Sequence, residues 1–205
     1  MTTYGVAILT VLVAGTTVVA RDVILVMLKP EYLEAARIIP LIALGMGFQG
    51  VYLLTSIGLN LTSRTEFYPV STFTAAAVGL GSGVFLMPRY GIVGAATAFL
   101  LSYLTQAAVA FVLAQRFYPV SYEVGRLARV MAAGILATSA GLWAVPPMRP
   151  ILSLFARGVV TVAVYAGLLW TSGFFRLTER AFLREVITKL RQRASSPRPS
   201  SIDAD

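Results

Sequence analysis

The chain has 205 residues, of which 57% are hydrophobic and 13% are charged, and its net charge is +8. It contains no cysteine and no histidine, which excludes disulfides, thiolate nucleophiles, histidine-bound metals and catalysis by imidazole. A mean hydropathy of +0.77 is far above that of soluble globular proteins, so the composition indicates a membrane protein.

Uncharged stretches dominate the sequence, and each is long enough to cross a hydrocarbon layer of about 30 Å, which takes about 20 helical residues. Their continuous Ala, Leu, Val and Gly lack the alternation of a membrane barrel. We therefore predict an all-α, polytopic transmembrane helix bundle of about six spans. The six stretches are residues 2–20, 38–63, 67–88, 90–115, 130–148 and 158–175.

The first stretch begins almost at the first residue and has neither a basic start nor a small-residue cleavage site, so we expect a retained span and not a signal peptide. Its abrupt start suggests the tail end of a longer protein. Arg21 and Asp22 interrupt the apolar run that continues to Leu28. Two interpretations remain open: an intramembrane ion pair, or a span that ends at Ala20 with residues 23–28 at the outer interface.

The second helix is expected to begin near Glu31 or Tyr32, with a kink at Pro40. Short turns at residues 86–91 and 146–150 predict antiparallel neighbours on either side of each turn. Residues 1–175 thus form a six-span lobe. Residues 176–193 are predicted to form an amphipathic helix at the cytoplasmic interface, and the Pro- and Ser-rich residues 194–205 a disordered tail.

Basic residues occur mainly in the connections between spans, which favours membrane topology over nucleic-acid binding as the reason for the positive charge. With six crossings, eleven of them lie on the side of the termini and six on the other side. The positive-inside tendency then places both termini in the cytoplasm of a cell (inner) membrane protein.

Small residues recur four apart in three of the spans. Close backbone approach along such stripes is a main source of helix association in lipid, so we interpret them as packing faces, with a substrate groove as the alternative. The stripes are Ala75, Gly79 and Gly83; Gly91 and Ala95, or Gly94 and Ala98; and Ala133, Ala137 and Gly141.

Gln49 and Gln106 are the polar side chains within the spans that most need a partner, because an amide cannot bond back to its own helix as a hydroxyl does. We expect both to face the bundle interior or a wet cavity, as residues of a substrate path or as helix-to-helix bonds. Tyr52, on the same span as Gln49, is a third candidate for such a path. No catalytic, metal-binding or cofactor-binding residue is predicted, since no span centre carries a carboxylate.

Residues 30–122 resemble the second half of the polysaccharide or oligosaccharide-lipid flippases, in the superfamily that also includes multidrug exporters. Residues 30–36 are similar to an outer loop of that family, and residues 58–65, with Arg64 and Thr65, are similar to a cytoplasmic turn. The most specific match is residues 87–98, with Pro88, Tyr90 and Gly91, followed by Ser102 and Tyr103.

The resemblance implies one lobe of a two-lobe transporter, with a missing N-terminal lobe or second half as partner. It also implies that Arg64 lies at the cytoplasmic mouth of the substrate path and meets an anionic headgroup, with a topology charge in a loop as the alternative role. The implied activity is non-enzymatic movement of a lipid-linked glycan across the cytoplasmic membrane during cell-surface polysaccharide biosynthesis, by alternating access. A multidrug-type exporter lobe and a non-catalytic scaffold subunit of a glycan assembly complex are the alternatives. An intramembrane enzyme lacks the residues for its chemistry.

Overall fold

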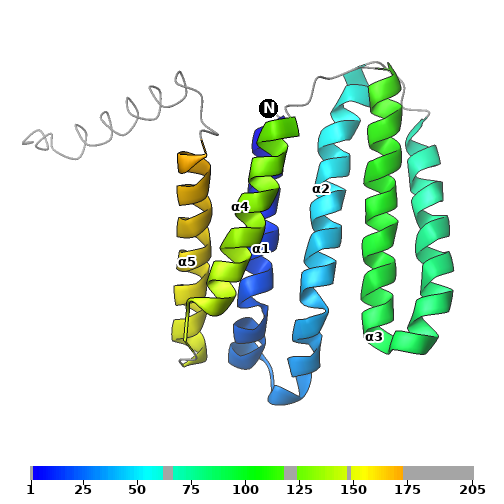
Figure 1. Cartoon of the computed structure of the whole chain (residues 1–205). Coiled ribbons are helices and arrows are strands. Elements are labelled where there is room, and N and C mark those ends of the chain that lie inside the picture. The colour runs from blue at the N-terminus through cyan, green and yellow to red at the C-terminus, as the bar shows by residue number, and fades with distance from the viewer. Residues whose placement is uncertain (1, 62–66, 118–123, 147–148, 173–205) are drawn as a thin grey trace, which may run out of the picture.

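The computed structural model describes residues 2–61, 67–117, 124–146 and 149–172, and every element in this part of the chain is helical (Figure 1). The predicted all-α fold is therefore confirmed for the described residues. The elements in chain order are α1 (Thr2–Met27), the 3₁₀ helix η1 (Pro30–Arg37), α2 (Ile39–Leu61), α3 (Tyr68–Phe117), α4 (Val124–Trp143) and α5 (Pro150–Thr171).

Within the described residues, four helices are long and apolar enough to cross a membrane: α1, α2, α3 and α5. Helix α4 is a separate case, because Arg126 and Arg129 occupy its first turns and shorten its apolar part. Four helices of this kind agree with a membrane protein.

Helix α3 consists of two helical arms that meet at Gly91, where φ is +56° and ψ is −131°. Only glycine adopts this backbone conformation readily, and Pro88 already prevents regular helical bonding one turn earlier. The arms run antiparallel, since the Ser102 hydroxyl donates a hydrogen bond of 2.9 Å to the Ala75 carbonyl (Figure 1). The predicted tight turn between residues 86 and 91 is thus confirmed.

The helices are arranged around α1, which packs against α5, α4 and α2, while α3 packs on the far side of α2. The start of α1 lies at the same end of the bundle as the end of α5 and the two ends of α3, and the Gly91 turn and η1 lie at the opposite end (Figure 1). We call these the terminal end and the turn end.

The core lies between α1, α4 and α5, where Val6 and Ala7 meet Val130, Tyr165 and Leu169. The α4 stripe predicted from small residues faces this core. Ala133 and Ala137 are buried in it, and a Cβ on Gly141 would touch Val18 of α1 and Thr161 of α5. The packing interpretation is confirmed for this stripe.

Three predicted boundaries are wrong. Helix α1 does not end at Ala20 but continues to Met27, so Arg21 and Asp22 are part of the helix. Helix α2 begins at Ile39 and not near Glu31 or Tyr32, which belong to η1, so Pro40 lies in its first turn, where a missing N–H costs nothing, and does not kink it. Helix α5 begins at Pro150, so Arg157 lies inside it and not before it. The predicted interfacial helix at 176–193 and tail at 194–205 lie outside the described residues.

Replacement of Gly91 tests the turn of α3. Gly91→Ala should lower the free energy of unfolding by about 1–3 kcal/mol, because a Cβ is strained at this backbone conformation. The matched control is Gly81→Ala, in the first arm of α3, where a Cβ meets nothing within 4 Å and alanine favours helix. Reversible unfolding in mixed micelles measures both. Equal stabilities of the two variants would contradict the assigned role of Gly91.

Candidate functional site

The predicted path residues on α2 share one face of the helix. Gly45, Gln49, Tyr52 and Ser56 follow each other at intervals of four, three and four residues, which places them in one stripe. A Cβ on Gly45 would lie 2.9 Å from the ring of Phe99 on α3, and the Tyr68 hydroxyl of α3 donates a 2.9 Å hydrogen bond to the Ser56 carbonyl. The stripe therefore faces α3.

Tyr52 contributes an aromatic contact to this interface, with its ring centroid 6.5 Å from that of Tyr68 and the planes at 74°. This is the edge-to-face arrangement that aromatic pairs prefer. Arg64, the fourth candidate, lies outside the described residues.

Gln106 lies on the second arm of α3 and is buried, with 8% of its surface exposed. Its Nε2 is 3.5 Å from the Thr72 hydroxyl of the first arm, which is at the limit of a hydrogen bond. The amide thus bridges the two arms only weakly.

Gln49 contributes a buried Oε1 without a hydrogen-bond partner among the described residues. An unsatisfied buried acceptor costs about 1–3 kcal/mol, and the cost is recovered only when a donor reaches it. Gln49 therefore lies on the face of α2 toward α3 and Gln106 lies between the two arms of α3, and neither amide is fully satisfied there. We call Gln49, Tyr52, Thr72 and Gln106 the α2–α3 polar cluster.

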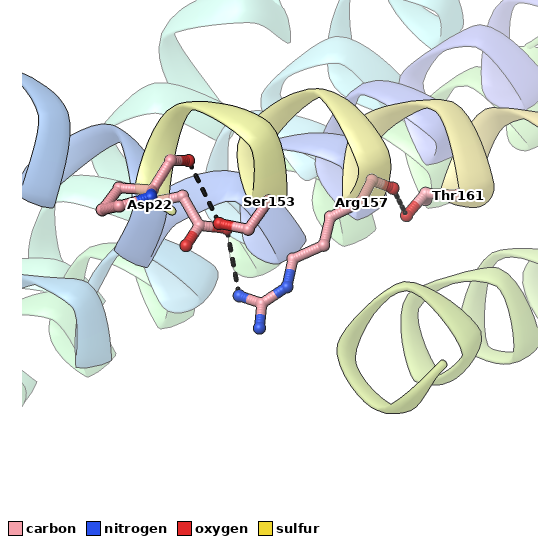
Figure 2. Close-up of polar contacts among 5 residues, drawn as sticks. Asp22, Ser153, Arg157 and Thr161 are labelled. Atoms are coloured by element: carbon pink, nitrogen blue, oxygen red, sulfur yellow. Dashed lines mark hydrogen bonds and ion pairs between the residues drawn. The ribbon is translucent and has the colours of Figure 1, made fainter. Parts of the chain in front are cut away.

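A second polar site joins α1 to α5. The Arg157 guanidinium donates from Nη1 to Asp22 Oδ2 at 3.0 Å, and Figure 2 shows the two side chains meeting between their helices. The two side chains are 13% and 6% exposed, respectively. The ion pair that the sequence left open exists, but its cation is Arg157, because Arg21 points outward and is exposed.

The ion pair lies inside the apolar part of the helices. Asp22 is five residues before the end of α1 and Arg157 seven after the start of α5, which puts the pair about 8–10 Å from the turn end. Neighbouring hydroxyls bond to α5 itself: Ser153 to the Pro150 carbonyl and Thr161 to the Arg157 carbonyl (Figure 2). The Nε of Arg157 is buried and has no partner within the described ranges.

Each charge of this pair lowers the free-energy cost of burying the other. A lone charged side chain near the centre of a membrane helix costs at least about 2.5–3.5 kcal/mol, and a charge-assisted hydrogen bond offsets part of that cost. Replacing both residues of a buried ion pair by apolar residues often stabilises a protein. The presence of the pair is therefore weak evidence that its role is to stabilise the fold.

The chemistry available at the two sites follows from these side chains. Amides, hydroxyls, one carboxylate and one guanidinium can bind, orient and exchange polar partners. Among the described residues no three of His, Cys, Asp and Glu come together as a metal site would require. Asp22 and Arg157 were missed as a pair because 135 residues separate them. Both, however, interrupt long apolar stretches, and this was the signal available in the sequence.

Comparisons with protein-family models, with curated proteins and with solved structures found no match to this chain. The functional argument therefore depends on its own residues.

Loss of one charge should destabilise the α1–α5 contact. We expect Asp22→Asn to lower the free energy of unfolding by about 3–5 kcal/mol, because Arg157 is left as an uncompensated buried charge. The double variant Asp22→Leu with Arg157→Met should recover most of this loss, since it removes both charges. Arg21→Gln is the control, one residue away and exposed. Unfolding in mixed micelles measures all of them, and an Asp22→Asn effect no larger than that of Arg21→Gln would contradict the ion pair.

Proposed function

We propose that the chain is the C-terminal lobe of a flippase that translocates lipid-linked oligosaccharide across the cytoplasmic membrane for cell-surface polysaccharide biosynthesis. The observation that carries the proposal is the ordered set of three short motifs between residues 30 and 103, ending in the turn with Pro88, Tyr90 and Gly91. Gly91 supports it, because its positive φ makes this motif a helix hairpin within a helical bundle.

In this proposal the lobe crosses the membrane six times, because the two arms of α3 count separately and α4 crosses beside α1 and α5. The terminal end, with Arg116, Arg126 and Arg129 near it, faces the cytoplasm in agreement with the positive-inside tendency. The turn end faces outward.

The substrate path of this proposal includes the α2–α3 polar cluster. Gln49 has an acceptor and Gln106 a weakly engaged amide, so both can exchange partners with hydroxyl groups of a passing glycan. No covalent step is involved. A second lobe, in the same polypeptide or a partner subunit, supplies the other wall of the path, and the two lobes alternate in access.

A multidrug-type exporter lobe and a scaffold subunit of a glycan assembly complex are the rival functions, since fold alone does not determine function. The substrate that the assembly moves distinguishes these functions from one another. The assembly that contains this chain is isolated from its membrane and reconstituted with a fluorescent polyprenyl-pyrophosphate oligosaccharide, and transbilayer movement is measured by quenching the outer leaflet.

We expect movement above that of protein-free liposomes, and a fall of about tenfold in rate for Gln49→Leu or Gln106→Leu, which corresponds to one lost hydrogen bond. The Gln49 variant should keep its unfolding stability, because it removes an unsatisfied acceptor. Thr74→Val, on the exposed side of α3, is the control. Movement of an amphipathic cationic dye but not of the glycolipid would favour an exporter, and movement of neither a scaffold.

The orientation is tested by single-cysteine labelling, which is straightforward because the chain has no cysteine of its own. We expect Arg89→Cys to react with an impermeant maleimide from outside the cell. Arg116→Cys, at the other end of the second α3 arm, should react only in inverted membrane vesicles. Labelling of both from one side would contradict the six-crossing topology.

A further inference from the structure

The two arms of α3 enclose a groove of about 820 Å³. The lining residues are small ones, whose short side chains leave the groove empty, and larger apolar ones at its rim. Those from the first arm include Gly79, Gly83 and Met87, and those from the second Ala95, Ala98 and Phe99. At one end of the groove, Ala76 and Ser102 lie one helical turn from Thr72 and Gln106, which bridge the same two arms.

The lining of the groove has little to offer a polar ligand. The Ser102 hydroxyl already donates to the Ala75 carbonyl, and the Tyr103 ring packs edge-on against Phe99 with centroids 4.6 Å apart. Leu80 and Val84 on the rim are 74% and 71% exposed. Such a surface gains by covering hydrocarbon and loses by desolvating sugar or phosphate.

The length of the groove agrees with one lipid leaflet. From Ala76 to Pro88 the first arm rises about 18 Å, at about 1.5 Å per residue. Half of a hydrocarbon core of about 30 Å is about 15 Å. An acyl chain entering at the Pro88 end would thus end near the bilayer centre, close to Ala76.

A positive charge lies at the Pro88 end of the groove. Arg89 follows Pro88 of the lining, is exposed, and makes no ion pair within the part of the chain that the structure describes. Tyr90 beside it is 62% exposed, as is common for aromatic residues at the level of lipid headgroups. The apolar groove and the cation together complement a lipid that carries a phosphate next to its chains.

We propose that the groove between the α3 arms is a binding site for one anionic phospholipid, with an acyl chain between the arms and its phosphate at Arg89. The proposal does not depend on the transport function. It also gives the small residues of α3 a second role, because Gly83 keeps open a space that a larger side chain would fill.

Gly83 and Arg89 allow each half of the site to be tested by itself. A Cβ on Gly83 meets only Ala98 Cβ at 3.9 Å and Met87 Sδ at 4.0 Å, so the first carbon of Gly83→Leu is accommodated and the rest of the side chain is added at the groove that Gly83 lines. Gly81→Leu adds the same side chain where nothing lies within 4 Å of the Cβ, outside the lining. Arg89→Gln removes the cation, and Arg37→Gln, exposed on η1 at the same end, is its control.

The full chain in detergent is titrated with phosphatidylglycerol and with phosphatidylcholine of the same acyl chains, and bound lipid is counted by native mass spectrometry. We expect one preferred phosphatidylglycerol. Gly83→Leu should weaken the binding of both lipids about tenfold. Arg89→Gln should weaken phosphatidylglycerol alone, about fivefold, and so remove the preference.

Unchanged lipid binding by Gly83→Leu overturns the proposal, as does a phosphatidylglycerol preference that survives Arg89→Gln. A dimer that Gly83→Leu dissociates, without any lipid adduct, also overturns it and assigns the groove to a second copy of the chain. Arg89→Gln changes only an exposed side chain, so it decides the question even where Gly83→Leu fails to fold.

Discussion

Buried polar groups join the first and the last described helix of this bundle and fix how the two helices meet. Arg157 of α5 reaches Asp22 of α1 near the turn end, and the Tyr165 hydroxyl donates a 2.9 Å hydrogen bond to the Ala7 carbonyl further along the same interface. Hydrocarbon offers no substitute partner for these groups, so separating the helices would leave both charges and the Tyr165 hydroxyl without partners. Helix α4 packs over this closed pair, and α2 brings α3 to its other side.

Local sequence was enough to predict most of the helices and the sharpest turn. Pro88 and Gly91 act on their immediate neighbours, so the hairpin within α3 follows from residues close together in the chain. The predicted end of α1 was wrong for the opposite reason. Arg21 and Asp22 look like the end of a span when read locally, but Asp22 is neutralised by a residue from α5, and no local pattern contains that information.

The sequence predicted which residues of the candidate site turn inward but not which groups they contact. We expected Gln49 and Gln106 to turn inward because an amide exposed to hydrocarbon is costly, and the structure places Gln49 on the α2 face toward α3 and Gln106 between the α3 arms. Which groups they would meet depends on the register of three helical segments, which spacing along the chain does not determine. Thr72 as the weak partner of Gln106, and the unpartnered Oε1 of Gln49, therefore emerged only from the folded structure.

The position of α2 has a mechanical consequence. The α3 hairpin is attached through α2, and the boundary between α1 and α2 contains two apolar depressions of about 290 and 90 Å³, both lined by residues that include Leu9, Val13 and Gly47. Beside these depressions the two helices interlock, because a Cβ on Gly47 of α2 would lie 2.9 Å from Val13 Cγ2 of α1 and a Cβ on Gly50 would clash with Leu9. A larger side chain at Gly47 or Gly50 would therefore push α2 away from α1, and α3 would move with α2 because it packs on that helix.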